Sequence, residues 1–438
     1  MITFLRKIEL GLYTYREARN AVRRQFDIVE IRKIRMMKLQ RLLHYCSNKV
    51  KYYKEVFQQA GIDPKKITTL DDLESIPILT KKDLRDRFWD FLPSKLPECR
   101  VTRTSGSTGI PVCFLSDRNA RKFNSAAVIR SRKAAGIPLI GRPILTPLKT
   151  ANDPPRKPHW TFLQGIHQTY YINPYLDSAD NSEYAARLFE KLERPAVLGI
   201  TPATRALAQK IHDGAFPPLR PIAVLTTGEP LRPEVRGLLE STFQTKVSDI
   251  YGCSEGGEIA WQCHRNRGYH INAENCIVEI VKGNKPVAIG ETGEVVITNL
   301  NRYAMPIIRY KNGDLARLST EMCSCGCQLP MIEEIAGRTG EDMSLPNGKT
   351  IPWNQLKSLM THQRIRQFQL VQEKDGSLTI RYIPEDISET EQLDALLRFR
   401  FQHLLGDSTE IKTEKTAVIN PADGGKSKLV VSHYRPGQ

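Results

Sequence analysis

The chain has 438 residues, of which 40% are hydrophobic and 26% are charged, and its formal net charge is +16. This length predicts two or three domains, and the composition is that of a globular protein rather than a disordered one. No stretch approaches the roughly 20 apolar residues of a membrane helix. The apolar run at the N-terminus is broken by Arg6, Lys7 and Glu9, unlike a signal peptide. We therefore expect a soluble, cytoplasmic protein.

Residues 1–90 are predicted to be a largely helical and basic lead-in. Residues 1–66 hold 16 Lys and Arg against 6 Asp and Glu, and 27–51 have apolar residues at helical spacing. The basic face is either a solvated surface or a site that attracts an anionic partner, such as a nucleotide-bearing substrate, a polyanion, an acidic carrier or a membrane surface. No nucleic-acid-binding motif accompanies the charge, so we expect no specific nucleic-acid partner.

From about residue 100 to 300, short apolar strands alternate with helices, which predicts an α/β domain with a substantially parallel sheet. The segment from 276 to 300 alternates with period two and indicates β structure. After a turn-rich stretch near 337–349, the pattern of strands, one helix and a last strand predicts an α+β unit of about 100 residues. A domain boundary is expected at about 337–342.

Four stretches carry candidate chemistry, namely RTSGSTGIP (103–111), TGEPL (227–231), DIYGCSE (249–255) and MPIIRYKNGD (305–314). In the first, glycines allow backbone N–H groups to approach phosphate oxygens closely, and hydroxyl side chains add donors. It is not a Walker A loop, because it contains no GKS or GKT. Taken alone it also fits a flexible linker, and each of the other three stretches is a weak signal.

In their order and spacing, the four stretches resemble the adenylate-forming superfamily of acyl-CoA synthetases and adenylation enzymes. The closest resemblance is to the phenylacetate–coenzyme A ligase-like branch, including members found near capsular-polysaccharide genes and deazaflavin-coenzyme synthetase-like proteins. It extends from about residue 78 to the end. It implies an α/β N-terminal domain over 1–337 with mixed and parallel sheets and a β-rich subdomain, a hinge over 338–342, and a small mobile α+β domain over 343–438.

The resemblance also implies a role for each motif in binding ATP and Mg²⁺. Glu255 would bind Mg²⁺, which prefers oxygen ligands. A lone carboxylate can accept from both ribose hydroxyls, which is the role implied for Asp314. For Arg309, a structural ion pair is an equally good interpretation. The implied nucleotide-binding residues are Thr104, Ser105, Gly106, Ser107, Thr108 and Gly109 at the phosphates, Gly228, Glu229, Pro230, Tyr251 and Gly252 at adenine, Ser254 near the α-phosphate, and Asp314, Arg309 and Arg338.

Near the C-terminus, PADGGKSK presents a lysine after a glycine-rich turn. The resemblance implies that Lys426 is the adenylation lysine, with Lys428 as the fallback. When a carboxylate attacks the α-phosphorus, negative charge builds on a crowded centre, and a mobile cation that contacts both reactants stabilises it. The sequence departs from many relatives in two places. The phosphate loop has no following lysine, and the hinge acid aligns with Gly340 or Glu341, so the pivot is Glu341 or Asp342 and the ease of domain rotation stays open.

A cysteine cluster, EMCSCGCQLP, follows these motifs. In a reducing cytosol such clusters are more often metal ligands than disulfides. Together with an upstream Cys and His they supply three thiolates and an imidazole, a tetrahedral Zn²⁺ set, and the resembling relatives carry a similar arrangement. Four protein ligands leave no open position, which predicts a structural zinc. The expected ligands are Cys263, His270, Cys323 and Cys325, with Cys327 and His264 in reserve. The other cysteines, Cys46, Cys99, Cys113 and Cys276, are expected to be small buried hydrophobic residues, and Cys253 is expected to pack beside the nucleotide.

The expected function is an ATP-dependent carboxylate-activating ligase that uses ATP, Mg²⁺, structural Zn²⁺ and coenzyme A. It would form an acyl-adenylate and pass the acyl group to coenzyme A, with a small aromatic acid as the substrate suggested by the resemblance. One alternative is transfer to an amine or hydroxyl acceptor such as a sugar or peptide, and another is a non-catalytic basic binding protein that keeps the fold. The acid pocket is expected from 125–170 and 200–260, where the aromatic residues are either pocket or core. These residues are Trp160, Phe162, Tyr170 and Tyr171. The sequence does not fix the oligomeric state, and a dimer is one option.

Overall fold

The computed structural model describes residues 2–103, 112–149, 153–229, 231–338, 343–351, 353–360, 365–384, 390–406, 409–416, 419 and 430–434. By its internal contacts the chain divides into two compact units. The larger comprises Met1–Thr102, Phe114–Asn312 and Ala316–Ile335, and the smaller comprises Arg103–Cys113, Gly313–Leu315 and Ala336–Gln438. Of the predicted hinge, residues 339–342 lie outside the described residues, so the hinge stays a prediction.

Within the first 91 residues lie helices α1 to α4 and three 3-10 turns, and helices alternate with strands after residue 117. The helices and 3-10 turns of the larger unit are α1 Ile2–Arg24, α2 Ile28–Lys49, α3 Lys51–Gln59, η1 Pro64–Lys66, η2 Asp71–Ser75, α4 Lys81–Asp86, η3 Phe88–Phe91, α5 Arg118–Ala134, α6 Ala179–Lys191, α7 Thr201–His212 and α8 Pro233–Phe243. Its strands are β1 Cys99–Arg103, β2 Cys113–Asp117, β3 Ile144–Pro147, β4 His159–Thr161, β5 His167–Ile172, β6 Ala196–Ile200, β7 Ala223–Thr227, β8 Val247–Cys253, β9 Gly257–Trp261, β10 Tyr269–Ile271, β11 Cys276–Lys282, β12 Lys285–Pro286, β13 Thr292–Asn299, β14 Tyr310–Leu318 and β15 Met331–Arg338.

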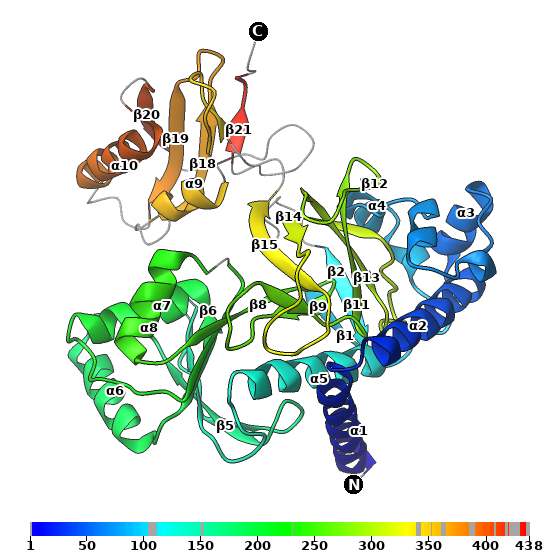
Figure 1. Cartoon of the computed structure of the whole chain (residues 1–438). Helices are drawn as coiled ribbons and strands as arrows, with labels where there is room; N and C mark the ends of the chain where they lie inside the picture. Colours follow the sequence, from blue (N-terminus) through cyan, green and yellow to red (C-terminus); the bar gives the residue numbers. More distant parts are fainter. Residues whose placement is uncertain are drawn as a thin grey trace. The chain divides into compact units, whose positions relative to one another are not determined.

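Within the described residues, a 13-stranded mixed sheet organises the chain (Figure 1), in the order β12-β11-β13-β14-β15-β10-β9-β8-β7-β6-β3-β5-β4. The five strands β5, β3, β6, β7 and β8 pair in parallel, which confirms the predicted parallel sheet. From β8 onward the pairing becomes antiparallel through β9, β10 and β15. The carboxyl ends of the parallel strands therefore lie next to the first antiparallel hairpin, which is where ligands bind in sheets of this kind.

Helices α6, α7 and α8 supply apolar side chains to the core of the parallel half. Their residues pack with strand residues into one buried cluster, which excludes water from that half of the sheet. Tyr170 belongs to this cluster, so for this residue the core interpretation is confirmed. The members include Leu145, Tyr170, Ile172, Ala185, Leu188, Phe189, Val197, Leu207, Phe216, Val224, Leu239, Phe243 and Val247.

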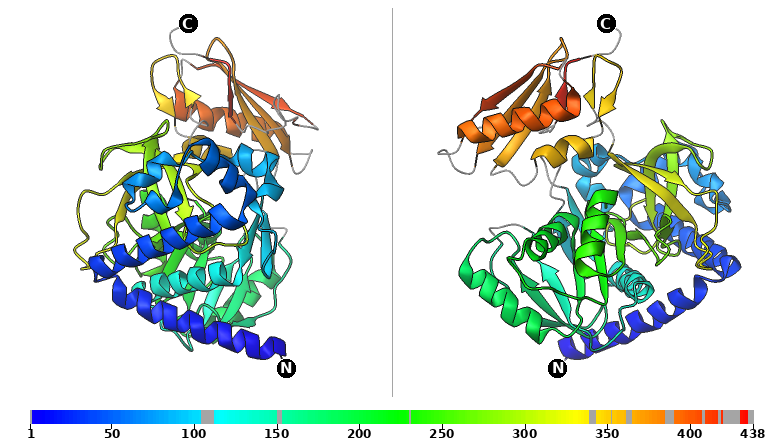
Figure 2. Two further views of the ribbon diagram at one scale, coloured as in Figure 1. Left: turned by 90° about the vertical axis from the view of Figure 1, so that its right-hand side faces the viewer. Right: turned by 60° about the vertical axis from the view of Figure 1, so that its left-hand side comes forward.

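The basic lead-in packs into the larger unit, with α1 and α2 running along one edge of it (Figure 2). Helix α2 starts at an Asp27 cap and buries one apolar face that includes Ile31, Leu39 and Leu42. One lysine of the predicted basic face is not solvated. The Lys38 ammonium donates to the backbone oxygen of Glu274 at 2.7 Å and lies 3.6 Å from the centre of the Phe123 ring. Burial lowers the pKa of Lys38 to about 7.

Beside this contact, a buried ion pair joins α5 to the loop after β10. The Arg130 guanidinium donates to Glu274 Oε1 at 2.7 Å and also to the side chain of Asn272. The two charged side chains are only 1% and 3% exposed. Removing one partner of such a pair leaves an uncompensated buried charge. The pair therefore holds the helical lead-in and the sheet together through α5.

Arg130→Met should lower the free energy of unfolding by about 3–5 kcal/mol, because the Glu274 carboxylate would then be buried without its cation. The double variant Arg130→Met/Glu274→Gln should lose clearly less, since it removes both charges. Denaturant unfolding of the three proteins measures both effects. A loss below about 1 kcal/mol in the single variant would show that water or another cation reaches Glu274.

The smaller unit is the α+β structure that the sequence predicts. Its elements are β16 Met343–Ser344, β17 Thr350–Ile351, α9 Trp353–Met360, β18 Ile365–Gln372, β19 Leu378–Pro384, α10 Thr390–Leu405, β20 Ile411–Lys415 and β21 Val430–Ser432. The larger sheet of this unit has the order β20-β19-β18-β21. Leu397, Phe401 and Leu405 recur along one side of α10 and join the buried cluster of this unit with Ile380 and Tyr382 of β19. The short strand β21 lies beyond the last strand that the sequence predicts.

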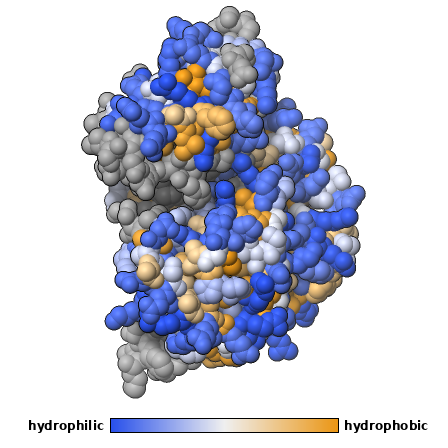
Figure 3. Space-filling model, turned by 90° about the vertical axis from the view of Figure 1, so that its left-hand side faces the viewer, coloured by the Kyte–Doolittle hydropathy of each residue, from blue (hydrophilic) through white to orange (hydrophobic). Residues whose placement is uncertain are grey.

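On the face drawn in Figure 3, hydrophilic residues predominate and apolar residues form small groups between them. Among the described helices, none combines the length and the apolar run needed to cross a membrane.

Candidate functional site

Two of the four motifs stand at the carboxyl ends of adjacent parallel strands. Strand β7 ends at Thr227, which is opposite Ile250 of β8, so Gly228 and Tyr251 follow at the same edge of the sheet. Gly228 has φ of +87°, a left-handed conformation that favours glycine. The Thr201 hydroxyl at the start of α7 donates to the backbone oxygen of Glu229 at 2.9 Å and fixes this turn. Pro230 lies outside the described residues.

The YGCSE residues form the end of β8 and the turn into β9. The Tyr251 hydroxyl accepts from the Asn312 amide at 2.8 Å. At Gly252 a Cβ would lie 2.6 Å from the backbone oxygen of Gly257, so only glycine fits. The Glu255 side chain is buried, and its Oε1 accepts from the Tyr310 hydroxyl at 3.1 Å. The turn is thus held by contacts from strand β14 and the residues next to it.

Arg309 does not take part in this turn. Its side chain is 1% exposed, forms an ion pair with Glu279 at 2.9 Å and donates to the backbone oxygens of Glu74 and Ile76. These contacts occupy the guanidinium and match the ion-pair interpretation. The assignment of Arg309 to nucleotide binding is therefore corrected: its physical role is to fasten the lead-in to the β-rich part of the sheet.

Several predicted residues cannot be placed in the site. The phosphate-loop residues Thr104, Ser105, Gly106, Ser107, Thr108 and Gly109, together with Lys426, Lys428 and the hinge residues Gly340, Glu341 and Asp342, lie outside the described residues. Arg338 is the last residue of β15, and its backbone alone is described. Asp314 lies in the middle of β14, directly after Gly313, whose φ is +86°. Their roles remain predictions.

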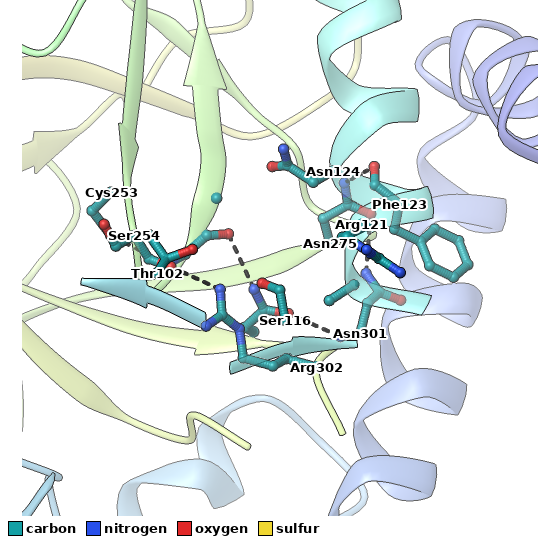
Figure 4. Close-up of a pocket in the computed structure, with 14 residues that line it drawn as sticks. Thr102, Ser116, Arg121, Phe123, Asn124, Cys253, Ser254, Asn275, Asn301 and Arg302 are labelled. Carbon is teal, nitrogen blue, oxygen red and sulfur yellow. Dashed lines mark hydrogen bonds between the residues drawn. The ribbon is translucent and has the colours of Figure 1, made fainter. Parts of the chain in front are cut away.

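A cavity of about 200 Å³ lies beside Ser254 (Figure 4). Its walls come from the ends of β1 and β2, from α5, from the turn after β8 and from the segments before β11 and after β13. The lining residues are Thr102, Ser116, Ala120, Arg121, Phe123, Asn124, Cys253, Ser254, Gly256, Gly257, Asn275, Asn299, Asn301 and Arg302. Sequence reasoning found only Cys253 and Ser254 among them.

The aromatic residues expected in the acid pocket do not line this cavity. Trp160 and Phe162 lie at the sheet edge near β4 and are 53% and 59% exposed, and Tyr170 is in the core. Tyr171 of β5 stacks on His159 of the adjacent edge strand. Among the described lining residues, Phe123 is the one aromatic side chain. The acid pocket expected over 125–170 and 200–260 stays a prediction.

Arg302 is the most unusual group in the lining. Figure 4 shows its guanidinium pointing toward Ser254, whose backbone oxygen accepts from Nη2 at 2.7 Å. The residue is 3% exposed, and its Nε and Nη1 have no hydrogen-bond partner among the described residues. Burial lowers the pKa of Arg302, and the electrostatic interactions with Cys253, Glu255 and Asp117 raise it by a smaller amount. A buried cation with unused donors next to Ser254 suits an oxygen-rich ligand.

The four predicted metal ligands form a compact group. Cys263 follows β9, His270 lies in β10, and Cys323 and Cys325 lie in the loop between β14 and β15. Pairing of β10 with β9 and β15 brings them together, with His270 opposite both Trp261 and Met331. One ligand atom from each of the four lies within 4.8 Å of the others. The reserve residues Cys327 and His264 are not in this group.

The distances within this group match a tetrahedral metal centre. The Cys263 and Cys323 sulfurs are 3.7 Å apart, and Cys325 Sγ is 3.4 Å from His270 Nε2. Around one zinc ion, two sulfurs lie roughly 3.8 Å apart and a sulfur and a nitrogen roughly 3.6 Å apart. Burial lowers the pKa of His270 to about 4, so its imidazole is neutral, as a ligand must be. Backbone N–H groups of Arg265 and Cys327 donate to two of the sulfurs, at 3.4 Å each, and would stabilise thiolates.

The remaining cysteines follow the prediction in part. Cys46 and Cys276 are fully buried, as expected for small hydrophobic residues. Cys99 and Cys113 are half-buried instead, because they lie at the ends of the two-stranded β1–β2 sheet. None of the nine cysteines, all of which are described, forms a disulfide.

Comparison with known sequences finds similarity to phenylacetate-coenzyme A ligases and to CapK proteins. Residues 343–433 match the family model of the CapK C-terminal domain. The chain is 29% identical over 372 residues to a phenylacetate-coenzyme A ligase of Thermus thermophilus, covering 82% of each chain. It is 25% identical to the phenylacetate-coenzyme A ligase of Escherichia coli, covering 91% of this chain and 94% of the relative. It is 20% identical to protein CapK of Staphylococcus aureus, with 94% and 92% covered.

Solved structures share the fold. A crystal structure of 2-hydroxyisobutyryl-CoA ligase in the postadenylation state has a TM-score of 0.66 and 19% identity, covering 92% of this chain and 90% of that one. A second structure of that ligase, described in the thioesterification state with CoA, has a TM-score of 0.62 and 20% identity, with 93% and 90% covered. The likeness extends over nearly the whole length of both chains and shows that the α/β architecture and the small α+β unit occur together in a known fold.

Proposed function

The chain belongs to the phenylacetate–coenzyme A ligase-like branch of the adenylate-forming superfamily, and from that premise we propose that it activates a small carboxylic acid with ATP and transfers the acyl group to coenzyme A. The observation that carries this proposal is the YGCSE turn at the carboxyl end of β8, with Ser254 and Glu255 beside a polar cavity, in a chain related over nearly its full length to such ligases. A ligand bound at this edge meets several strand ends at once.

The proposed reaction has two steps. In the first, a carboxylate oxygen attacks the α-phosphorus of ATP, the bond to the β-phosphate breaks, and pyrophosphate leaves with an acyl-adenylate remaining. In the second, the thiolate of coenzyme A attacks the acyl carbon and AMP leaves. Both steps depend on positioning and on donors aimed at the developing charge.

We assign the residues of this chain as follows. Residues 104–109 would hold the β- and γ-phosphates, and Asp314 would accept from the ribose hydroxyls. Lys426 would stabilise the charge that develops at the α-phosphate, and Arg338 would contact the ribose or phosphates at the hinge. Adenine would bind between the 228–230 turn and Tyr251.

Two metal ions are part of the proposal. The Glu255 carboxylate, held at one oxygen by Tyr310, suits Mg²⁺, which would neutralise phosphate charge when bound. The Cys263, His270, Cys323 and Cys325 group suits zinc, which would have a structural role because four protein ligands leave no site for substrate.

Acid-dependent pyrophosphate release should reveal the activity. We expect release with at least one acid in a panel of small aryl, aliphatic and oxygenated carboxylic acids, and a thioester product only when coenzyme A is present. Pyrophosphate and thiol consumption are measured in parallel, with and without coenzyme A. If pyrophosphate is released without thiol consumption, and an added amine or hydroxyl compound then forms an amide or ester, that compound and not coenzyme A is the acyl acceptor. Absence of release with every acid would overturn the proposal.

A further inference from the structure

The cavity beside Ser254 is small. Its volume of about 200 Å³ is below the roughly 300–1,000 Å³ of pockets for drug-sized ligands. It lies entirely in the larger unit, between α5 and the turns after β8 and β13. Since Ser254 and Glu255 are proposed to lie at the reacting phosphate, this cavity is the adjoining space for the rest of the acid.

Among the described residues, no carboxylate forms an ion pair with the Arg302 cation in this cavity. Of the nearby acids, Asp117 accepts from the backbone N–H groups of Tyr303 and Ala304 at 2.7 and 2.8 Å, and Glu255 accepts from Tyr310. Neither forms a hydrogen bond with Arg302 among the described residues. An unpaired buried donor is unfavourable by about 1–3 kcal/mol, and more when it is charged. A ligand that accepts from Nε or Nη1 would remove that penalty.

Three of the asparagines that line the cavity form a wall whose side chains are held in fixed orientations. Asn301 donates its amide to Asn275 Oδ1 at 3.1 Å, Asn275 donates to the backbone oxygen of Phe123 at 3.0 Å, and Asn299 donates to that of Gly256 at 3.1 Å. These bonds leave the asparagine wall little freedom to rearrange around a ligand. The fold therefore keeps these polar side chains in place whether or not a ligand is bound.

Asn124 differs from the other asparagines. Its Oδ1 accepts from the backbone N–H of Glu258 at 2.7 Å, which assigns the amide orientation because an N–H can only donate to the oxygen. A Cβ at Gly257 would lie 2.3 Å from this oxygen, so the side chain fits tightly against the turn. Its Nδ2 donates no hydrogen bond to another described residue, and Asn124 lines the cavity together with Arg302.

The cavity thus offers hydrogen-bond donors, and its surface is polar and apolar in equal parts. Arg121 contributes a second guanidinium, and the described lining residues include no carboxylate and one aromatic side chain, Phe123. An unsubstituted aryl or alkyl group placed here would leave the Arg302 and Asn124 donors buried without acceptors. When a site is built to hydrogen-bond a polar group of the substrate, an analogue that lacks this group has a kcat/KM lower by about 10⁴-fold.

We infer that the acid activated by this protein carries an oxygen acceptor, a hydroxyl or a second carboxylate, beyond its reacting carboxylate, and that Arg302 and Asn124 bind this oxygen. The inference rests on the proposed function. It departs from the aryl acid that the family resemblance implies. Arg302 and Asn124 are specificity-determining residues for the acid and take no part in binding ATP.

Pyrophosphate exchange with matched acids tests the substrate class. Butyrate, 3-hydroxybutyrate, succinate and phenylacetate are compared at equal concentrations. We expect kcat/KM for the better of 3-hydroxybutyrate and succinate to exceed that for butyrate and phenylacetate by about 100-fold. The two oxygenated acids distinguish a hydroxyl from a carboxylate as the preferred acceptor. Higher activity with butyrate or phenylacetate would overturn the inference while the proposed function stands, and no exchange with any acid would overturn both.

Variants test the residues. Arg302→Met should raise KM for the preferred oxygenated acid by about 30-fold while KM for ATP stays within about two-fold. Asn124→Asp keeps the acceptor for the Glu258 N–H, so it should fold, and it replaces the donor by an anion that repels the acid. Arg220→Met, which removes an exposed arginine bound to the backbone oxygen of Thr242, is the control and should change neither constant. An equal rise in KM for ATP, or equal losses with butyrate and with the oxygenated acid, would overturn the assignment of these residues.

Discussion

Lys426→Ala should lower the rate of acid-dependent pyrophosphate exchange by about 100-fold or more, the loss seen when one donor to a developing charge is removed. ATP affinity should change little, because the proposed interaction forms mainly in the transition state and not in the ground state. Exchange of labelled pyrophosphate measures the first quantity, and equilibrium binding of ATP measures the second. The effect is expected in kcat more than in KM for ATP.

Lys428→Ala is the matched control, because it removes the same charge two residues away. It should retain nearly full exchange. If Lys428→Ala loses exchange while Lys426→Ala does not, the role belongs to the fallback lysine. Full activity in both variants would remove the adenylation lysine from this segment, and with it one of the main arguments for an adenylating enzyme.

Purified protein should contain one zinc ion per chain, and its removal should destabilise the larger unit. A structural metal stabilises the folded state by mass action, by about 4 kcal/mol when zinc is present at 1,000 times its Kd. In a unit of about 320 residues that corresponds to a fall in the unfolding midpoint of roughly 6 °C. Elemental analysis gives the metal content, and calorimetry before and after treatment with a chelator gives the midpoint.

Cysteine variants assign the zinc to its ligands. Cys263→Ser should reduce the zinc content and lower the midpoint to that of the chelated protein. Cys327→Ser is the control: this residue is also buried in the same loop, yet its sulfur is outside the group of four. If both variants lose zinc equally, or if chelation leaves the midpoint unchanged, the assignment of a structural zinc to these four ligands is wrong.

The sequence predicted those parts of the molecule that depend on local pattern. Alternating strands and helices predicted the parallel sheet, and the period of two over 276–300 indicated the β structure that forms β11 and β13. Turn residues marked the ends of β7 and β8, because Gly228 and Gly252 meet steric demands that any sequence must satisfy at those points. The metal group was found because cysteine and histidine are chemically distinctive even when they are 50 residues apart.

The contents of the cavity could not be predicted in the same way. Arg302 follows β13 in a polar run, NLNRY, whose sequence is typical of an exposed turn. Its burial arises from contacts with the Ser254 turn and with Phe114 of β2, residues that are distant in sequence. Lys38 shows the same limit. Nothing local distinguishes it from the solvated lysines of its helix, and only the position of Glu274 decides its burial.

The long-range contacts of the lead-in have a consequence for synthesis on the ribosome. Lys38 donates to the oxygen of a residue 236 positions later, and the Tyr53 hydroxyl donates to that of Pro306, 253 positions later. At a translation rate of about 5–20 residues per second, the first helices wait roughly 10 to 50 s for these partners. During that interval the apolar faces of α2 and α3 are exposed on a nascent chain. Chaperone binding to these helices, and aggregation of fragments that end before residue 310, are therefore expected properties of this fold.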